Sequence, residues 1–141
     1  MIEDYFKGCL YFAVSSLNRT VNRLAEEAFI STGLSPNYAF LLMLVNEKNG
    51  ISQKEICNHL NLMPSTVSRF IDKLEAKGLI KRRVDGKNAF IYLTKQGSDL
   101  QPEIEKAWEI LYNRYSEILG FAEGDALTSL IYEASKTLEN K

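Results

Sequence analysis

The sequence predicts a mainly α-helical protein with one small β-hairpin, and three observations support this fold class. Apolar residues recur at helical spacing over most of the 141 residues. Two short helical segments joined by a tight turn lie between Ser52 and Lys77. An Asp-Gly pair then separates two β-prone runs, which is a strong hairpin signal. The length fits a single domain.

The N-terminal third predicts two helices. The first runs from about Asp4 to about Ile30, because its apolar residues keep helical spacing, and Gly33 closes it. Ser35 and Pro36 then suit the N-cap and the first position of a second helix. The predicted buried side of this second helix consists of Tyr38, Leu41, Leu42 and Val45.

The central stretch predicts a helix-turn-helix. Ser52 and Glu55 have the spacing of a capping box at the start of a helix. Residues 61–63 are too few for anything but a turn, and Pro64 suits a first helical turn because its φ is already fixed. The predicted buried stripe of the second helix consists of Val67, Ile71 and Leu74.

The opposite face of this second helix carries hydroxyl groups and cations. Such side chains suit the DNA major groove, although an ordinary solvated face would share the pattern. The hairpin favours the first interpretation, because Gly78 ends the helix and the cationic hairpin that follows makes a winged helix-turn-helix. The predicted DNA-binding residues are Ser52, Lys54, Pro64, Ser65, Thr66, Ser68, Arg69, Lys73, Arg82, Arg83 and Lys87.

The distribution of charge agrees with a DNA-binding region. The whole chain has a net charge of −1. Between Ser52 and Lys95, however, there are nine Lys and Arg residues and four acidic residues. The net charge of this region is therefore about +5, and that of the rest of the chain is about −6. This asymmetry concentrates the attraction for phosphates in one region of the chain.

The C-terminal third predicts two further helices. Thr94 caps a long segment with Pro102 inside it, where a kink is expected, and a break spans Gly120 to Gly124 before the last helix. The long terminal helices have more apolar surface than a small domain can cover, so we expect a two-fold homodimer. We expect a helical dimerisation region at 1–33 and 98–141, and a DNA-binding lobe at 34–97.

The sequence gives little support for catalysis or for a cofactor. His59 is the only histidine, which excludes a histidine-based triad or a histidine-rich metal cluster within one chain. No phosphate-binding glycine loop is present, and the carboxylates are scattered. We therefore expect no enzyme activity, catalytic residue, metal site or cofactor. No apolar run approaches the roughly 20 residues of a membrane span and the N-terminus is acidic, so we expect no membrane contact and a cytoplasmic protein.

Motifs along nearly the whole chain resemble one family. They are Leu34-Ser35-Pro36, Ser52-Gln53-Lys54-Glu55-Ile56, Pro64-Ser65-Thr66-Val67-Ser68-Arg69, Asp72-Lys73-Leu74-Glu75, Lys77-Gly78-Leu79-Ile80, Arg82-Arg83, Asp85 and Leu93-Thr94. This succession resembles the MarR family of bacterial transcriptional regulators. The resemblance implies a homodimer with a winged helix-turn-helix in each subunit, which binds a partly palindromic operator. It also implies a repressor that a small molecule or an oxidant releases.

Two kinds of effector fit this resemblance. A small apolar or aromatic molecule would bind in the crevice between the dimer helices and the DNA-binding lobe, because such pockets are lined by aromatic side chains. The aromatic candidates, each of which could also simply fill the core, are Tyr11, Phe12, Phe40, Trp108 and Tyr115. Alternatively, Cys9 could make the protein redox-responsive, since some family members sense peroxides through an N-terminal cysteine flanked by aromatic residues. Cys57 fits a small buried hydrophobe.

A function of another class also fits a winged helix. The cationic face could bind an acidic protein partner, and the protein would then be an adaptor. An adaptor has no need for Ser65, Thr66, Ser68 and Arg69 together on one exposed face. The sequence therefore favours a regulator that binds double-stranded DNA.

Overall fold

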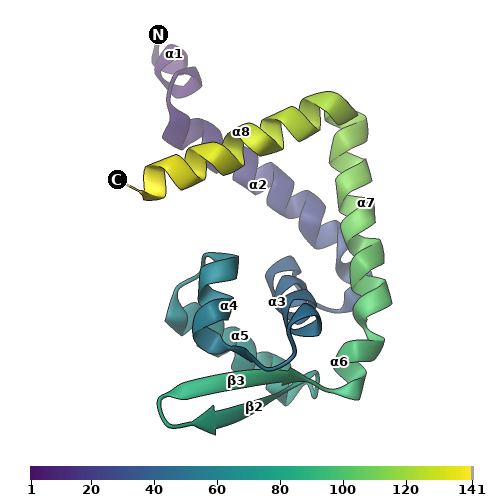
Figure 1. Cartoon of the computed structure of the whole chain (residues 1–141). Coiled ribbons are helices and arrows are strands. Elements are labelled where there is room, and N and C mark those ends of the chain that lie inside the picture. Colours follow the sequence, from purple (N-terminus) through teal and green to yellow (C-terminus); the bar gives the residue numbers. More distant parts are fainter. Residues whose placement is uncertain (141) are drawn as a thin grey trace. The chain divides into compact units, whose positions relative to one another are not determined.

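The computed structural model describes residues 1–140, which form two compact units. Within the described residues, unit 1 comprises residues 1–28 and 108–140, and unit 2 comprises residues 29–107. The elements follow one another in the order shown in Figure 1. They are α1 (Ile2–Lys7), α2 (Leu10–Ala28), the 3₁₀ helix η1 (Ile30–Thr32), α3 (Pro36–Glu47), β1 (Ile51–Ser52), α4 (Gln53–Leu60), α5 (Pro64–Ala76), β2 (Ile80–Asp85), β3 (Asn88–Leu93), α6 (Lys95–Asp99), α7 (Gln101–Leu119) and α8 (Phe121–Glu139).

Unit 2 has the predicted helix-turn-helix and hairpin, together with one strand that the sequence did not reveal. Its antiparallel sheet has the order β1-β3-β2, with Ile51 opposite Ile91. Helices α3, α4 and α5 lie beside the sheet (Figure 1). The core between these elements consists of fully buried aliphatic side chains. This core includes Leu41, Leu42, Val45, Ile51, Ile56, Val67, Ile71, Leu74 and Ile91. The predicted mainly helical fold class with a small hairpin is confirmed.

The helix-turn-helix begins and ends at the predicted residues. The Ser52 hydroxyl accepts a hydrogen bond from the backbone N–H of Glu55 (3.1 Å) and so caps α4. The Glu55 carboxylate binds Lys48 instead, with its Oε2 atom 2.6 Å from Nζ, so the serine half of the predicted capping box is the half that forms. This hydrogen bond from Lys48 lowers the pKa of the Glu55 carboxyl. Asn61 adopts a left-handed conformation and Pro64 begins α5.

The hairpin follows directly from the end of α5. Gly78 has φ +78°, and the N–H groups of Gly78 and Leu79 bond the carbonyls of Glu75 and Leu74, which is a Schellman motif. Asp85 and Asn88 pair at the end of the hairpin, with Gly86 and Lys87 between them as a two-residue loop. Gly86 has φ +63° at the first loop position, where L side chains are disfavoured. The hairpin therefore has a tight turn and begins only a few residues after α5 ends.

Thr94 joins the end of α5 to the start of α6, and its loss should destabilise unit 2. Its hydroxyl donates to the Gly78 carbonyl (2.6 Å) and accepts from the Gly97 N–H (3.1 Å). Thr94→Val keeps the shape but leaves both groups without this partner, so we expect a loss of about 1–2 kcal/mol of unfolding free energy. Urea unfolding followed by circular dichroism measures it. Thr137→Val, which removes an exposed hydroxyl bond within α8, is the control and should change stability by less than about 0.5 kcal/mol.

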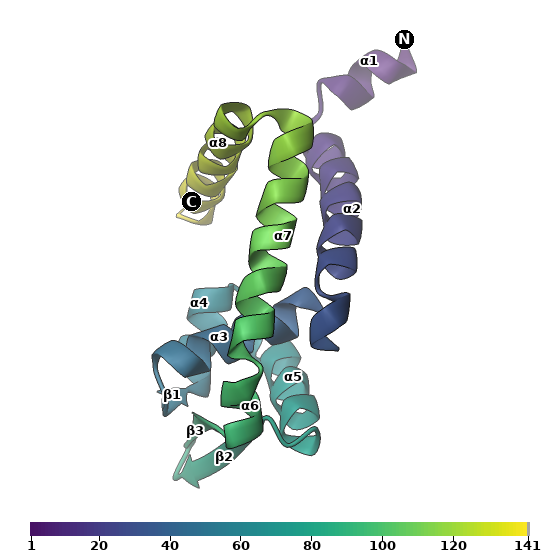
Figure 2. The ribbon, with the colours of Figure 1, turned by 90° about the vertical axis from the view of Figure 1, so that its right-hand side faces the viewer.

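In unit 1, the prediction of one continuous helix from about Asp4 to about Ile30 is wrong. The chain bends at Gly8 and Cys9 between α1 and α2 (Figure 2), and the second helix already ends at Ala28. Glycine is the poorest helix former apart from proline, which explains a break at this position. The rings of Phe6 and Phe12 stack across the bend, with centroids 4.6 Å apart.

The C-terminal helices correct two further predictions. Pro102 does not kink a long helix, because the segment after Thr94 divides at Leu100 and places Pro102 in the first turn of α7. A first-turn proline removes an N–H that would have no partner in the helix. The predicted break from Gly120 to Gly124 is shorter, since Gly120 (φ +98°) alone separates α7 from α8 and Gly124 lies buried inside α8.

Unit 1 exposes large apolar side chains on all its helices. The side chain of Leu130 is 70% exposed and that of Ile118 is 72% exposed. The others include Tyr5, Leu10, Tyr11, Val14, Phe121, Ile131, Tyr132 and Leu138. None of the helices in residues 1–140 is long and apolar enough to cross a membrane. An apolar surface of this extent is typical of a protein interface.

Candidate nucleic-acid interface

Helix α5 is held so that its predicted polar face points outward. Val67, Ile71 and Leu74 are fully buried in the core of unit 2. Because they lie on one side of the helix, residues on the other side reach solvent. Ser65, Arg69 and Lys73 are exposed there, in agreement with the predicted division of α5 into two faces.

The predicted DNA-binding residues all belong to unit 2, but they differ in exposure. The exposed ones are Lys54, Pro64, Ser65, Arg69, Lys73, Arg83 and Lys87. The half-buried ones are Ser52, Thr66, Ser68 and Arg82. The side chains of the first group are open to a ligand, whereas those of the second group expose only part of their surface, so burial separates residues that the sequence pattern treats alike.

Two cations on α5 have different surroundings. Lys73 lies over the ring of Tyr38, with Nζ 5.9 Å from the ring centroid, and the Tyr38 ring packs against Phe70 at 4.3 Å between centroids. Arg69 makes no hydrogen bond or ion pair with any residue in 1–140. An exposed guanidinium without an internal partner keeps all its donors available for a base or a phosphate.

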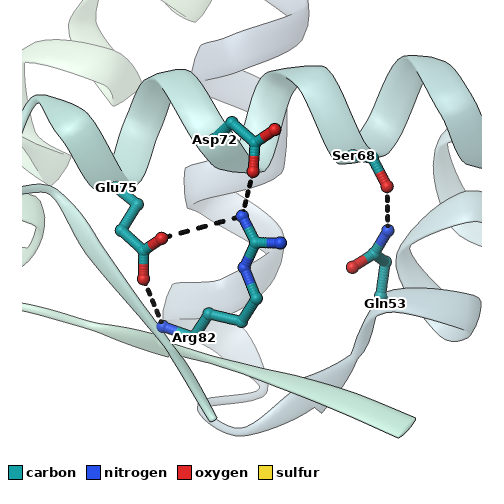
Figure 3. A network of polar contacts seen from close by, with 5 residues as sticks. All are labelled: Gln53, Ser68, Asp72, Glu75 and Arg82. Carbon is teal, nitrogen blue, oxygen red and sulfur yellow. Dashed lines mark hydrogen bonds and ion pairs between the residues drawn. The ribbon is translucent and has the colours of Figure 1, made fainter. Parts of the chain in front are cut away.

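Ser68 is held by a residue that the sequence did not single out for this purpose. The Gln53 side-chain amide, at the start of α4, donates a hydrogen bond of 2.7 Å to the Ser68 hydroxyl (Figure 3). This bond links the two helices of the helix-turn-helix and fixes the direction of the hydroxyl. No local sequence signal identifies this bond, because Gln53 and Ser68 are 15 positions apart and belong to different helices.

Arg82 and Arg83 point to opposite sides of β2. The guanidinium of Arg82 forms ion pairs with Asp72 and Glu75 on α5, whereas Arg83 is exposed. The strand alternation explains the difference, because successive side chains of a strand point to opposite faces. In the sequence, Asp72 and Glu75 belong to a family motif, and nothing in that motif predicts their pairing with Arg82.

The polar groups beside this face suit contact with nucleic acid. In residues 1–140, no group of three or more His, Cys, Asp or Glu side chains could hold a metal ion. His59 is exposed in the last turn of α4. The cations, hydroxyls and amides of this face are groups that bind phosphates and base edges, while the carboxylates of Asp72 and Glu75 on α5 pair with Arg82.

The aromatic effector candidates lie in both units. Phe40 belongs to unit 2, where its ring meets Phe29 edge-on at 5.7 Å between centroids, and the other four belong to unit 1. Tyr11 and Trp108 are exposed. Tyr115 lines a cavity of about 440 Å³ within unit 1. Burial raises the pKa of the Tyr115 hydroxyl. Apolar residues that also line this cavity include Leu17, Val21, Leu119, Leu127 and Ile131.

The two cysteines should differ in reactivity. Cys9 is exposed at the bend between α1 and α2, whereas Cys57 is half-buried on α4 and burial raises the pKa of its thiol. Because the thiolate is the reactive form, iodoacetamide should alkylate Cys9 several-fold faster than Cys57 near neutral pH. Quenched labelling followed by peptide mass spectrometry measures both rates. Equal rates would mean that Cys57 is more open in solution than in this structure.

Comparison with known proteins agrees with this geometry. Residues 34–89 match the model of the MarR family. The HTH-type transcriptional regulator MgrA of Staphylococcus aureus is 28% identical over 109 residues, which are 74% of this chain and 74% of MgrA. The structure of the transcriptional repressor CouR bound to p-coumaroyl-CoA is similar with a TM-score of 0.84 and 23% identity, covering 92% of this chain and 94% of CouR. The S. aureus MepR–DNA complex is similar with a TM-score of 0.79 and 19% identity, covering 92% of this chain and 98% of MepR.

Proposed function

The chain belongs to the MarR family of transcriptional regulators that bind DNA, and from this premise we propose that it is a homodimeric repressor which a small-molecule effector releases from a partly palindromic operator. The observation that carries the proposal is the exposed polar face of α5, with Arg69 free of internal partners and the cationic hairpin beside it in sequence. The local charge of about +5 supports the same face.

On this proposal, α5 is the recognition helix and lies in the major groove. Ser65, Thr66 and Arg69 near its N-terminal end would meet base edges, as in other helix-turn-helix proteins. Lys54, Lys73, Arg83 and Lys87 would meet phosphates, and these contacts position the protein without reading sequence. The half-buried Ser52 and Ser68 would add hydroxyl contacts at the junction of α4 and α5.

A dimer is the proposed functional form. The exposed apolar side chains of unit 1 support it, because a second copy is the simplest partner that covers them by two-fold symmetry. Two recognition helices about 34 Å apart would then read two half-sites of one operator. We therefore keep 1–33 and 98–141 as the proposed dimerisation region, with 34–97 as the proposed DNA-binding lobe.

The proposed effector is a small apolar or aromatic molecule. Support for an apolar ligand comes from the apolar cavity in unit 1, which Tyr115 lines. The structure of the repressor CouR holds p-coumaroyl-CoA, which supports a small-molecule effector for this chain. Such a molecule releases DNA only if it binds the DNA-free conformation more tightly than the DNA-bound one. In this proposal the protein's chemistry is binding, without catalysis, and it acts in the cytoplasm, where a bacterial operator lies.

The first experiment is selection of random DNA duplexes by the purified protein, followed by sequencing, at two salt concentrations. Enrichment of a palindrome supports a dimeric, sequence-specific regulator and identifies its operator. Salt-sensitive binding without an enriched sequence would contradict the proposal and favour the adaptor function.

The redox alternative through Cys9 has its own test. If Cys9 senses oxidants, peroxide releases the wild-type protein from its operator and Cys9→Ser abolishes this release. Cys57→Ser is the matched control, because it removes the other thiol from unit 2. Release that persists in Cys9→Ser excludes Cys9 as the sensor.

A further inference from the structure

Arg82 binds α5 through both its main chain and its side chain. Its backbone N–H donates to Glu75 Oε2 (3.1 Å), and its guanidinium Nη2 lies 3.7 Å from Glu75 Oε1. The same Nη2 also donates to Asp72 Oδ1. Figure 3 shows the guanidinium between the two carboxylates, which are three residues apart on α5. One residue of the hairpin is therefore held at three points by one helix.

The strand register places the Arg82 side chain on the buried face of the hairpin. Arg82 pairs with Ile91, which is fully buried, and Ile80 two residues earlier on β2 is also buried. The Arg82 side chain is 24% exposed and its Nε atom is buried. Arg83 pairs with Phe90 and is exposed on the other face. The two arginines, adjacent in sequence, thus have different surroundings.

The ion pairs of Arg82 with Asp72 and Glu75 determine how these three residues affect DNA binding. A guanidinium that already pairs with two carboxylates attracts a phosphate weakly, because its charge is compensated locally. The pairing also shields the two carboxylates, which lie on the helix proposed to enter the groove and would otherwise repel DNA phosphates. Arg82 is thus suited to hold the hairpin and unsuited to bind DNA directly.

We propose that Arg82 is a positioning residue that fixes the β2–β3 hairpin on α5, so that recognition helix and hairpin meet DNA as one rigid surface, and that it does not itself contact DNA. This inference rests on the proposed function, and it revises the assignment of Arg82 as a DNA-binding residue. Arg83 remains a proposed phosphate contact.

The two roles of Arg82 predict opposite effects for a change at its partners. In Asp72→Asn/Glu75→Gln, a DNA-contacting Arg82 would become a free cation and two negative charges would disappear, so operator binding would tighten. A positioning Arg82 loses its anchor in the same variant, so operator binding weakens by about threefold or more despite the more favourable charge.

Variants of Arg82 distinguish a positioning role from a direct electrostatic contact with DNA. Arg82→Lys keeps the positive charge but has no planar fork to bridge two carboxylates, so it should weaken binding nearly as much as Arg82→Gln. Neither variant should change the slope of log affinity against log salt by more than about 0.3 per subunit. Arg83→Gln, the matched control one residue away, should lower that slope by about 1 per subunit.

Hydrogen exchange of the hairpin amides gives a readout that needs no DNA. Exchange in residues 80–93 should rise in Arg82→Gln and in Asp72→Asn/Glu75→Gln, and should stay unchanged in Arg83→Gln. Circular dichroism confirms that each variant is folded. Faster hairpin exchange with an unchanged salt slope supports the proposal. Unchanged exchange, or a slope lowered by about 1 in Arg82→Gln and restored in Arg82→Lys, overturns it. Failure of Arg83→Gln to affect DNA binding would instead count against the proposed interface.

Discussion

Replacing Arg69 with alanine is expected to weaken binding to the selected operator by about 1–3 kcal/mol for each half-site, and to weaken binding to unrelated DNA far less. Arg69 is exposed on α5 and makes no hydrogen bond or ion pair in residues 1–140. Arginine can bind guanine with two hydrogen bonds, and this geometry is what alanine removes. Because alanine is the best helix former, α5 itself should remain intact. Fluorescence anisotropy with operator and scrambled duplexes, at two salt concentrations, measures both affinities.

Lys77→Ala is the matched control for Arg69→Ala. Lys77 is an exposed cation at the C-terminal end of the same helix, so its removal changes the charge of unit 2 equally. It should weaken binding to both duplexes slightly and evenly, as the loss of a distant charge does. If Arg69→Ala also weakens both duplexes evenly, Arg69 contacts a phosphate and another residue of α5 reads the bases.

Local signals in the sequence predicted unit 2 well because they act within a few residues. Ser52 caps α4, Pro64 begins α5 and Gly78 ends it, each as expected. Each of these residues has a backbone preference that holds in almost any surroundings. The Asp-Gly hairpin signal is of the same kind, and the hairpin lies where it was predicted.

Pairings between distant residues could not be read in the same way. Strand β1 has two residues and exists because Ile51 pairs with Ile91, forty positions later in the numbering. The direction of Arg82 depends on strand alternation combined with the position of α5. The sequence carries a signal for it, since Arg82 follows the buried Ile80 by two residues, but a pair of adjacent arginines in a cationic hairpin equally predicts two DNA contacts.

The helix breaks were mispredicted because periodicity is a weak guide to where a helix stops. Apolar spacing continues through Gly8 and Cys9, although α1 and α2 are separate there. Pro102 fits equally well inside a helix pattern or at its start, and only the break at Leu100 decides between them. The sequence therefore located the helical regions of unit 1 better than their ends.

Leu130→Glu is expected to separate the proposed dimer, raising its dissociation constant by about 10³-fold or more. Leu130 is 70% exposed on α8, in a stripe with Leu127, Ala134 and Leu138 at helical spacing. In a two-fold interface the new carboxylate is buried twice, at a cost of roughly 2 kcal/mol or more for each copy. Since the side chain is exposed within one subunit, the subunit itself should still fold. Sedimentation velocity over a range of concentrations measures the equilibrium.

Ser129→Glu places the same charge at the neighbouring exposed position, about 100° around α8 and outside the stripe, and should leave the dimer intact. The operator affinity links this test to function. A monomer holds one recognition helix and reads one half-site, so Leu130→Glu should lose binding to the full palindrome while it keeps the affinity of wild type for a single half-site. A variant that stays dimeric at submicromolar concentration would exclude this stripe from the interface. A monomer that binds the palindrome like wild type would contradict the proposal that dimerisation and operator symmetry are linked.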